Sequence, residues 1–272
     1  NKKILITGGS GRVATWTLPY MRQKHEFRVL DIVPPKVEGV EFVKGSITEP
    51  ESVIKALDGV DSFINMVMMH PTDPHSNCAS VEDIVANYSV NTVGLHLLLY
   101  TAQSMGIMNG VHTSTFTVHA RNRTRFSAEE EVPLDNPGVY GLTKGFGERI
   151  CRYFCKEYGM SIAALRITGP RDRRGWIEGR KVPKRDPGHL WVTEERDLAT
   201  AYIAAVEFVQ GRVARFDPFF IAGDENEEEV NLSKARQLLG WKPKTSIETG
   251  LRFQLEWHNS LAEHFRTLQK VG

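Results

Sequence analysis

Short apolar segments alternate with stretches of helical periodicity along the first 167 residues. The apolar segments that predict strands are Lys3–Thr7, Phe27–Asp31, Val40–Lys44, Asp61–Asn65, Gly110–Thr115 and Ser161–Ile167. The periodic stretches that predict helices are Gly11–Lys24, Pro50–Leu57, Val81–Met105 and Gly138–Tyr158. Strands that alternate with helices are typical of βαβ units, so we expect a parallel sheet with helices on both of its faces.

The pattern changes after Ile167. Residues 169–188 are rich in glycine, proline and charge and predict a loop, and the acidic run Asp224–Glu229 predicts a solvated loop. The later periodic elements are a helix at Glu195–Val209, a strand at Phe216–Ala222, and helices at Leu232–Leu239 and Ile247–Leu268. The whole order of elements predicts an α/β fold with a Rossmann-type, doubly wound parallel sheet.

Composition limits the partners that we expect. The net charge is +1, 41% of the residues are hydrophobic and 25% are charged, which argues against nucleic acid or a membrane surface as a partner. No apolar run is long enough to span a bilayer, and the N-terminus lacks a signal-peptide pattern. The three cysteines are an odd number without paired ligand spacing, so we expect no metal site and a reducing, cytoplasmic location.

A glycine-rich turn, Thr7–Ala14, joins the first predicted strand to the first predicted helix. Gly8 permits the tight turn, Gly11 lets the backbone approach a pyrophosphate, and Ala14 is small enough for the helix to pack on the strand. The free N–H groups of the helix N-terminus would bind the phosphates of a dinucleotide. The other residues of the turn that we expect at these phosphates are Ser10, Arg12 and Val13.

Asp31 ends the second predicted strand, at the position where a carboxylate binds the ribose hydroxyls of such a dinucleotide. Its charge would repel a 2′-phosphate, so the sequence favours NAD over NADP. The Arg12 guanidinium could assist a phosphate and leaves NADP open, and an ordinary strand-end carboxylate is the plainer alternative for Asp31. Ser46 and Ile47 are expected near the adenine, and Asn65, Met66 and Val67 beneath the cofactor.

Tyr140 and Lys144 place a phenol and an ammonium one helical turn apart on the same face. The cation favours the phenolate and lowers the pKa of the tyrosine, which suits proton transfer at a substrate hydroxyl. Tyr20 and Lys24 have the same spacing, but no polar strand end faces them, and we interpret them as an incidental surface pair. The working pair is therefore predicted to be Tyr140 and Lys144.

Hydroxyl side chains end the fifth predicted strand. Thr113, Ser114 and Thr115 are the candidates, and strand alternation places Thr113 and Thr115 on one side and Ser114 on the other. Such hydroxyls often make only local hydrogen bonds. Beside Tyr140, however, we expect one of them to steady the substrate oxygen during proton transfer.

Thr7–Ala14, Asp31, Thr113–Thr115 and Tyr140–Lys144 together resemble the extended short-chain dehydrogenase/reductases, the NAD-dependent epimerase/dehydratase family. The resemblance covers nearly the whole chain. Its further segments are Asn91–Gly94, Leu165–Arg166, Gly169–Arg171 and Leu239–Pro243. It implies hydride transfer with Tyr140 as the acid/base, Lys144 as its partner and Thr115 at the position of the family's active-site serine or threonine.

The resemblance also implies the remaining contacts. Besides Tyr140 and Lys144, the residues that would contact the cofactor from these segments are Asn91, Thr113 and Ile167. The expected substrate-binding residues are Met69, Thr115, Phe116, Thr117, Tyr140, Thr168 and Arg174. Residues 1–167 would form the NAD-binding body, to which residues 195–223 return, and residues 168–194 and 224–272 would form a small substrate-binding cap.

Three functions fit this resemblance. Similarity of Gly138–Tyr158 to uronate dehydrogenases favours a net dehydrogenase of a small sugar or sugar acid, although Phe116-Thr117 replaces the expected Asn-His pair. The Leu239–Pro243 segment favours a sugar-nucleotide epimerase that recycles its NAD, whereas the short C-terminal region argues against a large nucleotide pocket. A dehydratase ranks below the epimerase, because its acid/base residues are not evident after Thr115. The third alternative is a cofactor-sensing regulator without catalysis, which has no need of Tyr140 and Lys144.

Two further features concern partners. The basic run Arg171–Arg185 would suit a carboxylate or phosphate on a sugar-type substrate, or it is simply a solvated loop. The predicted helices Val81–Met105 and Gly138–Tyr158 are the pair that this family often packs against a second subunit. We therefore expect a homodimer, although ordinary core packing would give the same apolar pattern.

Overall fold

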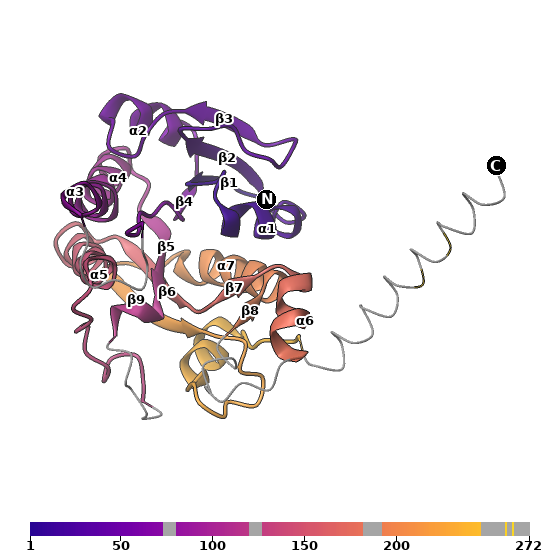
Figure 1. The fold of residues 1–272 in the computed structure, drawn as a ribbon. Coiled ribbons are helices and arrows are strands. Elements are labelled where there is room, and N and C mark those ends of the chain that lie inside the picture. Colours follow the sequence, from indigo (N-terminus) through magenta and orange to yellow (C-terminus); the bar gives the residue numbers. More distant parts are fainter. Residues whose placement is uncertain (73–79, 120–126, 182–191, 246–258, 260–262, 264–272) are drawn as a thin grey trace.

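The computed structural model describes residues 1–72, 80–119, 127–181, 192–245, 259 and 263 (Figure 1). Within these residues, seven parallel strands form one sheet in the order β3-β2-β1-β4-β5-β6-β9. The strands are β1 (Lys3–Thr7), β2 (Glu26–Asp31), β3 (Glu41–Lys44), β4 (Ser62–Asn65), β5 (Asn109–Thr115), β6 (Ser161–Ile167) and β9 (Arg215–Ile221). Two short strands, β7 (Pro170–Arg171) and β8 (Thr193–Glu194), pair separately.

Helices cover both faces of the sheet, as the alternation of elements predicts (Figure 1). The α-helices are α1 (Arg12–Met21), α2 (Pro50–Leu57), α3 (Val81–Tyr88), α4 (Leu95–Ser104), α5 (Val139–Tyr158), α6 (Arg173–Lys181) and α7 (Glu195–Val209). Helices α1 and α7 pack together on one face, and α2, α4 and α5 pack on the other. In the part of the chain that the structure describes, no helix has the length and apolar character needed to cross a membrane.

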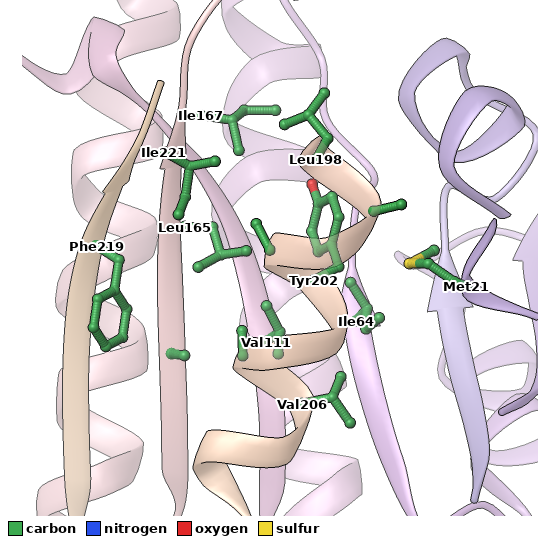
Figure 2. Close-up of a cluster of buried hydrophobic side chains, with 14 of the residues drawn as sticks. Met21, Ile64, Val111, Leu165, Ile167, Leu198, Tyr202, Val206, Phe219 and Ile221 are labelled. Carbon is green, nitrogen blue, oxygen red and sulfur yellow. The ribbon is translucent and has the colours of Figure 1, made fainter. Parts of the chain in front are cut away.

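Two apolar cores result from the alternation of side chains along the strands. Ile4 and Ile6 of β1 face the core under α1 and α7, whereas Leu5 faces the core under α2, α4 and α5. Figure 2 shows the first core, with Leu198, Tyr202 and Val206 of α7 lying over side chains of the central strands. Because helices cover both faces of the sheet, the sequences of the central strands are nearly continuous runs of apolar residues.

The strand order reverses between β1 and β4, and ligands of doubly wound sheets bind at such a reversal. The glycine-rich turn follows β1 at this edge, and Asn65 ends β4 beside it. The same edge carries the end of β5 at Thr115. The fold therefore gathers the predicted cofactor and catalytic segments at the C-terminal edge of the sheet.

The predicted helix Val81–Met105 is helical from Val81 to Ser104, but its middle is not α-helical. A π-helical segment at Ser89–Gly94 separates α3 from α4. Asn87 and Asn91 are buried there, and the Asn91 amide bonds the main-chain N and O of Met69 at 2.8 Å each. The π-helical turn, which is wider than an α-helical turn, occurs where Asn91 contacts Met69, 22 residues earlier in the chain. Helical periodicity does not encode such a contact.

The prediction of a loop over residues 169–188 is wrong for Arg173–Lys181, which forms α6. Asp172 caps this helix, since its carboxylate accepts the N–H of Gly175 at 2.8 Å. Trp176 and Ile177 are buried and give the helix an apolar side. The high content of glycine and charge in the sequence concealed this short amphipathic pattern.

One prediction after β9 also needs correction, whereas the predicted helix Leu232–Leu239 is found as helix over residues 233–239. Asp224 is buried, and its carboxylate accepts the N–H groups of Glu228, Glu229 and Val230, so the acidic run is a turn folded around one carboxylate. Ala235–Leu239 is a π-helical segment inside the predicted helix Leu232–Leu239. The predicted helix Ile247–Leu268 lies outside the described residues, apart from two positions.

Candidate active site

The turn after β1 has the geometry of a phosphate cradle. Gly8 has φ +74°, and a Cβ there would lie 2.5 Å from Val67 Cα, so only glycine fits beside the end of β4. Gly11 precedes α1 without a side-chain cap on the first N–H groups of the helix. These uncapped N–H groups, with a partial positive charge and no acidic residue in the first turn, fit a pyrophosphate.

The Asp31 carboxylate lies directly beside this turn. It accepts the main-chain N–H of Ser10 at 3.0 Å and of Val33 at 3.3 Å. The Ser10 hydroxyl donates to the Val33 carbonyl oxygen at 2.6 Å. The residue is half-buried, so its carboxylate orders the turn and stays partly exposed.

The other predicted cofactor residues surround the same edge. Asn65 is buried and accepts a hydrogen bond from Thr7, while Met66 is buried below the turn. Ile47 is buried against Gly94, whereas Ser46 is half-buried and its main-chain N–H donates to Glu49. The remaining members lie at the start of α1 (Arg12 and Val13), just after β4 (Val67) and at the end of β6 (Ile167). Their roles toward a cofactor stay predictions.

Tyr140 and Lys144 of α5 meet the end of β5. Lys144 is 3% exposed, and its Nζ donates a 2.5 Å hydrogen bond to the main-chain oxygen of Thr113. Tyr140 shares a side-chain hydrogen bond with Thr115. Gly141 permits this close approach, because a Cβ there would lie 2.4 Å from the carbonyl oxygen of Thr117. The structure thus brings the three predicted catalytic residues together.

Burial governs the ionisation of this pair. It raises the pKa of Tyr140 to about 12, although the hydrogen bond with Thr115 acts in the opposite direction. It lowers the pKa of Lys144 to about 8, although the fields of Cys151 and Glu148 oppose this. Lys144 is therefore mostly protonated at neutral pH, and its positive charge favours the phenolate of Tyr140.

A buried ion pair lies one further turn along α5 and was not anticipated. Arg166 of β6 binds Glu148 with two hydrogen bonds, Nε to Oε1 at 2.8 Å and Nη2 to Oε2 at 2.7 Å. Ser114 donates to the same carboxylate at 2.5 Å. The continuing spacing of four residues from Tyr140 through Lys144 to Glu148 was the available signal. This network fixes α5 against β5 and β6.

The predicted substrate residues do not all gather at one place. Thr117 lies beside Thr115, with its Oγ1 3.1 Å from Thr115 Oγ1. Met69 is exposed next to Asn91, and Phe116 packs against Phe220 with the ring centroids 4.6 Å apart and the ring planes tilted by 39°. Thr168 is buried at the end of β6, with its hydroxyl 3.2 Å from that of Thr193. These contacts leave their roles toward a substrate as predictions.

Arg174 lies on an exposed part of α6 and pairs with Glu178 at 3.2 Å. The rest of the predicted basic run, residues 182–185, lies outside the described residues. The second tyrosine–lysine pair lies elsewhere, since Tyr20 donates to Glu195 at 2.7 Å and Lys24 pairs with Glu207. It contacts α7 and takes no part in the candidate site.

The spacing of the cysteines predicts no metal site, and metal ions also bind through histidine and acidic side chains. Within the described part of the chain, no group of three or more such residues could hold a metal ion. Cys151 and Cys155 are buried free thiols of α5. Cys78 lies outside the described residues.

Comparison with known proteins places the fold and the motifs in a family. Residues 4–183 match the family model of the NAD dependent epimerase/dehydratase family. The chain is 31% identical over 223 residues to the uncharacterized protein y4nG of Sinorhizobium fredii. The aligned residues are 75% of this chain and 53% of y4nG. The chain therefore spans only about half the length of y4nG.

A second relative is similar over nearly its whole length. The NAD-dependent glucose-6-phosphate dehydrogenase of Haloferax volcanii is 22% identical over 266 residues, which are 90% of this chain and 94% of that enzyme. Solved structures with the same fold include a short-chain dehydrogenase/reductase superfamily protein from Agrobacterium tumefaciens with bound NAD (TM-score 0.76, 19% identity, 97% of this chain and 99% of that one). Another is a mutated uronate dehydrogenase (TM-score 0.71, 22% identity, 94% and 86%). These likenesses confirm the predicted doubly wound fold.

Replacing Lys144 with Met should make the protein more stable. The pKa of Lys144 is lowered from 10.5 to about 8, so its protonated form disfavours folding at neutral pH, and this penalty disappears as the pH rises from about 8 to about 10.5. After subtracting the lost hydrogen bond to Thr113, Lys144→Met should raise the free energy of unfolding by about 2 kcal/mol at neutral pH. Urea unfolding at several pH values measures this gain.

The matched control is Lys24→Met, which removes an exposed lysine from a surface ion pair. Its effect should stay within about 0.5 kcal/mol at every pH. A Lys144→Met protein less stable than the parent at neutral pH would contradict the assigned penalty, as would a gain that does not shrink at alkaline pH.

Proposed function

Because the chain belongs to the NAD-dependent epimerase/dehydratase family, we propose that it oxidises or reduces a sugar-type hydroxyl or carbonyl by hydride transfer, with Tyr140 as the acid/base. Membership confirms the family predicted from the sequence, with NAD as its cofactor. The observation that carries the proposed chemistry is the junction at the end of β5. There the Lys144 ammonium binds the Thr113 carbonyl while Tyr140 bonds Thr115.

The turn between β1 and α1 fits the cofactor. The turn at Gly8–Gly11 presents the uncapped N–H groups of α1, which suit a pyrophosphate, and in this proposal the neighbouring Asp31 binds the adenosine ribose. When bound, NAD supplies the site that accepts or returns the hydride. In this proposal the described residues hold it with its nicotinamide half toward the end of β5.

Each residue of the junction has a distinct role in the proposal. Tyr140 removes the proton of the substrate hydroxyl, or returns it in the reverse direction. Lys144 keeps its charge near the phenol and so lowers the free energy of the phenolate. The Thr115 hydroxyl bonds the same substrate oxygen and holds it at the distance that proton transfer needs.

A net dehydrogenase of a small sugar or sugar acid is the reaction that we favour. The relative with nearly full coverage is named a glucose-6-phosphate dehydrogenase, and a uronate dehydrogenase shares the fold. An epimerase remains the second candidate, and a non-enzymatic sensor is disfavoured by the assembled junction. The Leu239–Pro243 segment no longer argues for an epimerase, because Trp241 is buried and its Nε1 donates to the Asp197 carbonyl at 3.0 Å. The segment packs on α7 through Trp241, a structural contact that does not distinguish an epimerase from a dehydrogenase.

The substrate is proposed to carry a carboxylate or phosphate. Arg171 and Arg174 lie at the start of the segment that follows β6, and their side chains are exposed. A bidentate guanidinium would suit either anionic group. If an anionic substrate binds beside α6, the Arg174 guanidinium would leave Glu178 and bind the anionic group of the substrate.

A homodimer is the assembly that the surface favours. Exposed apolar and aromatic side chains gather on α3, α4 and α5, namely Val81, Ile84, Val85, Tyr88, Tyr100, Leu142, Tyr153 and Tyr158. A groove of about 480 Å³ runs between these helices. Exposed apolar side chains beside such a groove are typical of a subunit interface. Sedimentation velocity should give twice the 30.7 kDa of one chain, and a Tyr100→Glu variant should sediment as a monomer. A parent that sediments as a monomer at high concentration would contradict the dimer.

Replacing Tyr140 with Phe should abolish turnover and spare the cofactor. The variant loses only the hydroxyl that transfers the proton, so the rate should fall by about 100-fold or more. NAD⁺ affinity by calorimetry should stay within about twofold of the parent, because the turn at Gly8–Gly11 is unchanged. The assay uses a panel of aldoses, uronic acids and sugar nucleotides, with product separation to detect epimers. Equal turnover in the parent and in Tyr140→Phe would remove this residue from the chemistry.

Replacing Asp31 with Asn should relax the preference for NAD. The amide keeps the shape of the side chain but loses the charge that repels a 2′-phosphate, so the ratio of NAD⁺ to NADP⁺ affinity should fall by about tenfold or more. Calorimetric titration with both cofactors measures this ratio. Asp58→Asn, at an exposed carboxylate after α2, is the control and should leave it unchanged. An unchanged ratio in Asp31→Asn would place the ribose elsewhere.

A further inference from the structure

Tyr202 of α7 brings a hydroxyl into the apolar core under α1 and α7. The side chain is fully buried there. Figure 2 shows its ring on α7, with the hydroxyl oxygen at the end nearer Leu198 and Ile167. Ile167 ends β6, so the hydroxyl points toward the C-terminal edge of the sheet that carries the candidate site.

The hydroxyl of Tyr202 has one specific partner. It lies 2.9 Å from Oγ1 of Thr113, within hydrogen-bonding distance. Thr113 is also the residue whose main-chain oxygen accepts Nζ of Lys144 at 2.5 Å. Thr113 is therefore held from both faces of the sheet, by α7 through its side chain and by α5 through its main chain.

Packing alone does not explain this hydroxyl. A phenylalanine would fill the same space in the core, and a buried hydroxyl without a partner is unfavourable. The hydrogen bond between Tyr202 and Thr113 meets β5 two residues before Thr115, the predicted catalytic residue at the end of this strand. A constraint at this point of β5 fixes the carbonyl on which the Lys144 ammonium depends.

We propose that Tyr202 is a positioning residue, which fixes Thr113 at the end of β5 and thereby holds the Lys144 ammonium beside Tyr140. It acts through Thr113 and does not touch the substrate. The proposal rests on the proposed function, because it assigns Tyr202 to the acid/base chemistry of Tyr140. Without the Tyr202 hydroxyl, the end of β5 keeps its pairing with β6 but loses this restraint. The ammonium then lies farther from the phenol on average, and Tyr140 ionises at higher pH.

The ionisation of Tyr202 itself agrees with this role. Burial raises its pKa, and a negative charge on Tyr140 would raise it further. Tyr202 thus remains a neutral phenol while Tyr140 carries charge, and its hydrogen bond with Thr113 persists through the reaction.

The test compares pH–rate profiles of the parent, Tyr202→Phe, Thr113→Val and the double variant. The compound used is the one in the aldose, uronic acid and sugar nucleotide panel that the parent turns over fastest with NAD⁺. In Tyr202→Phe the limb of kcat that reports ionisation of Tyr140 should move upward by about 0.5 to 1 pH unit, so kcat below that limb falls about 3- to 10-fold. KM for the sugar and the NAD⁺ affinity should change less than about twofold.

Thr113→Val removes the other half of the hydrogen bond and keeps the carbonyl that binds Lys144. It should shift the profile by the same amount, and the double variant should shift it no further than either single change. Tyr20→Phe, which removes a tyrosine hydroxyl that bonds Glu195 away from the candidate site, is the matched control and should leave the profile in place. Thermal unfolding of every variant checks that each protein is folded.

Each outcome decides the proposal. A lower melting temperature with an unchanged profile in Tyr202→Phe would show a purely structural hydroxyl and overturn it. Additive shifts in the double variant would overturn the route through Thr113. If the parent is active and Tyr140→Phe is not, such results refute this inference alone. A parent that turns over no compound of the panel refutes the proposed function and this inference together.

Discussion

The buried ammonium of Lys144 is the constraint on which the candidate site depends. A cation that is 3% exposed is stable only where the protein replaces the water that it has lost. The Thr113 carbonyl supplies one acceptor at 2.5 Å, and the carboxylate of Glu148 lies one turn further along the same helix. Every element that fixes α5 against β5 therefore also fixes the charge that makes Tyr140 a useful base.

Polar side chains connect this junction to the cofactor turn through the interior of the sheet. Thr7 at the end of β1 bonds Asn65 of β4 at 2.5 Å, and Asn65 lies 3.1 Å from Nδ1 of His112 on β5. Burial, and then the charge of Lys144, lower the pKa of His112 well below its usual value, so this histidine is neutral. A positive charge on His112 would repel the Lys144 ammonium, so a neutral histidine is compatible with the charged lysine. The three strands at the reversal of the sheet are thus linked by neutral hydrogen bonds beneath the predicted cofactor path.

The other side of α5 is fixed by a charged network instead. Arg166 and Glu148 form a bidentate pair that is almost completely buried, and Arg166 also donates to the carbonyl of Glu129 at 2.8 Å. Removing one member would leave the other charge without a partner in the interior, which is far more costly than never burying either. The pair therefore fixes the position of α5 relative to β6. Because Tyr140 lies at the start of α5, its position is fixed with the helix.

The sequence contained the elements whose cause is local. Pro50 at the first turn of α2 and the apolar run of Lys3–Thr7 give the observed bounds, and the glycine-rich turn and the Tyr140–Lys144 spacing are found at one edge of the sheet. Features caused by distant contacts were missed. The π-helical turn at Asn91 accompanies its bonds to Met69, and the role of Tyr202 arises from a residue 89 positions earlier in the chain. Such partners are set by tertiary packing, which periodicity and propensity do not encode.

The most direct test of the account is a single-turnover measurement of reduced nicotinamide. Enzyme in excess over NAD⁺ is mixed with each aldose, uronic acid or sugar nucleotide, and the near-ultraviolet absorbance of the reduced cofactor is followed. The account predicts that at least one compound produces reduced nicotinamide, lasting for a net dehydrogenase and transient for an epimerase. Folded parent protein that binds NAD⁺ but forms no reduced nicotinamide with any such compound would contradict hydride transfer at this site.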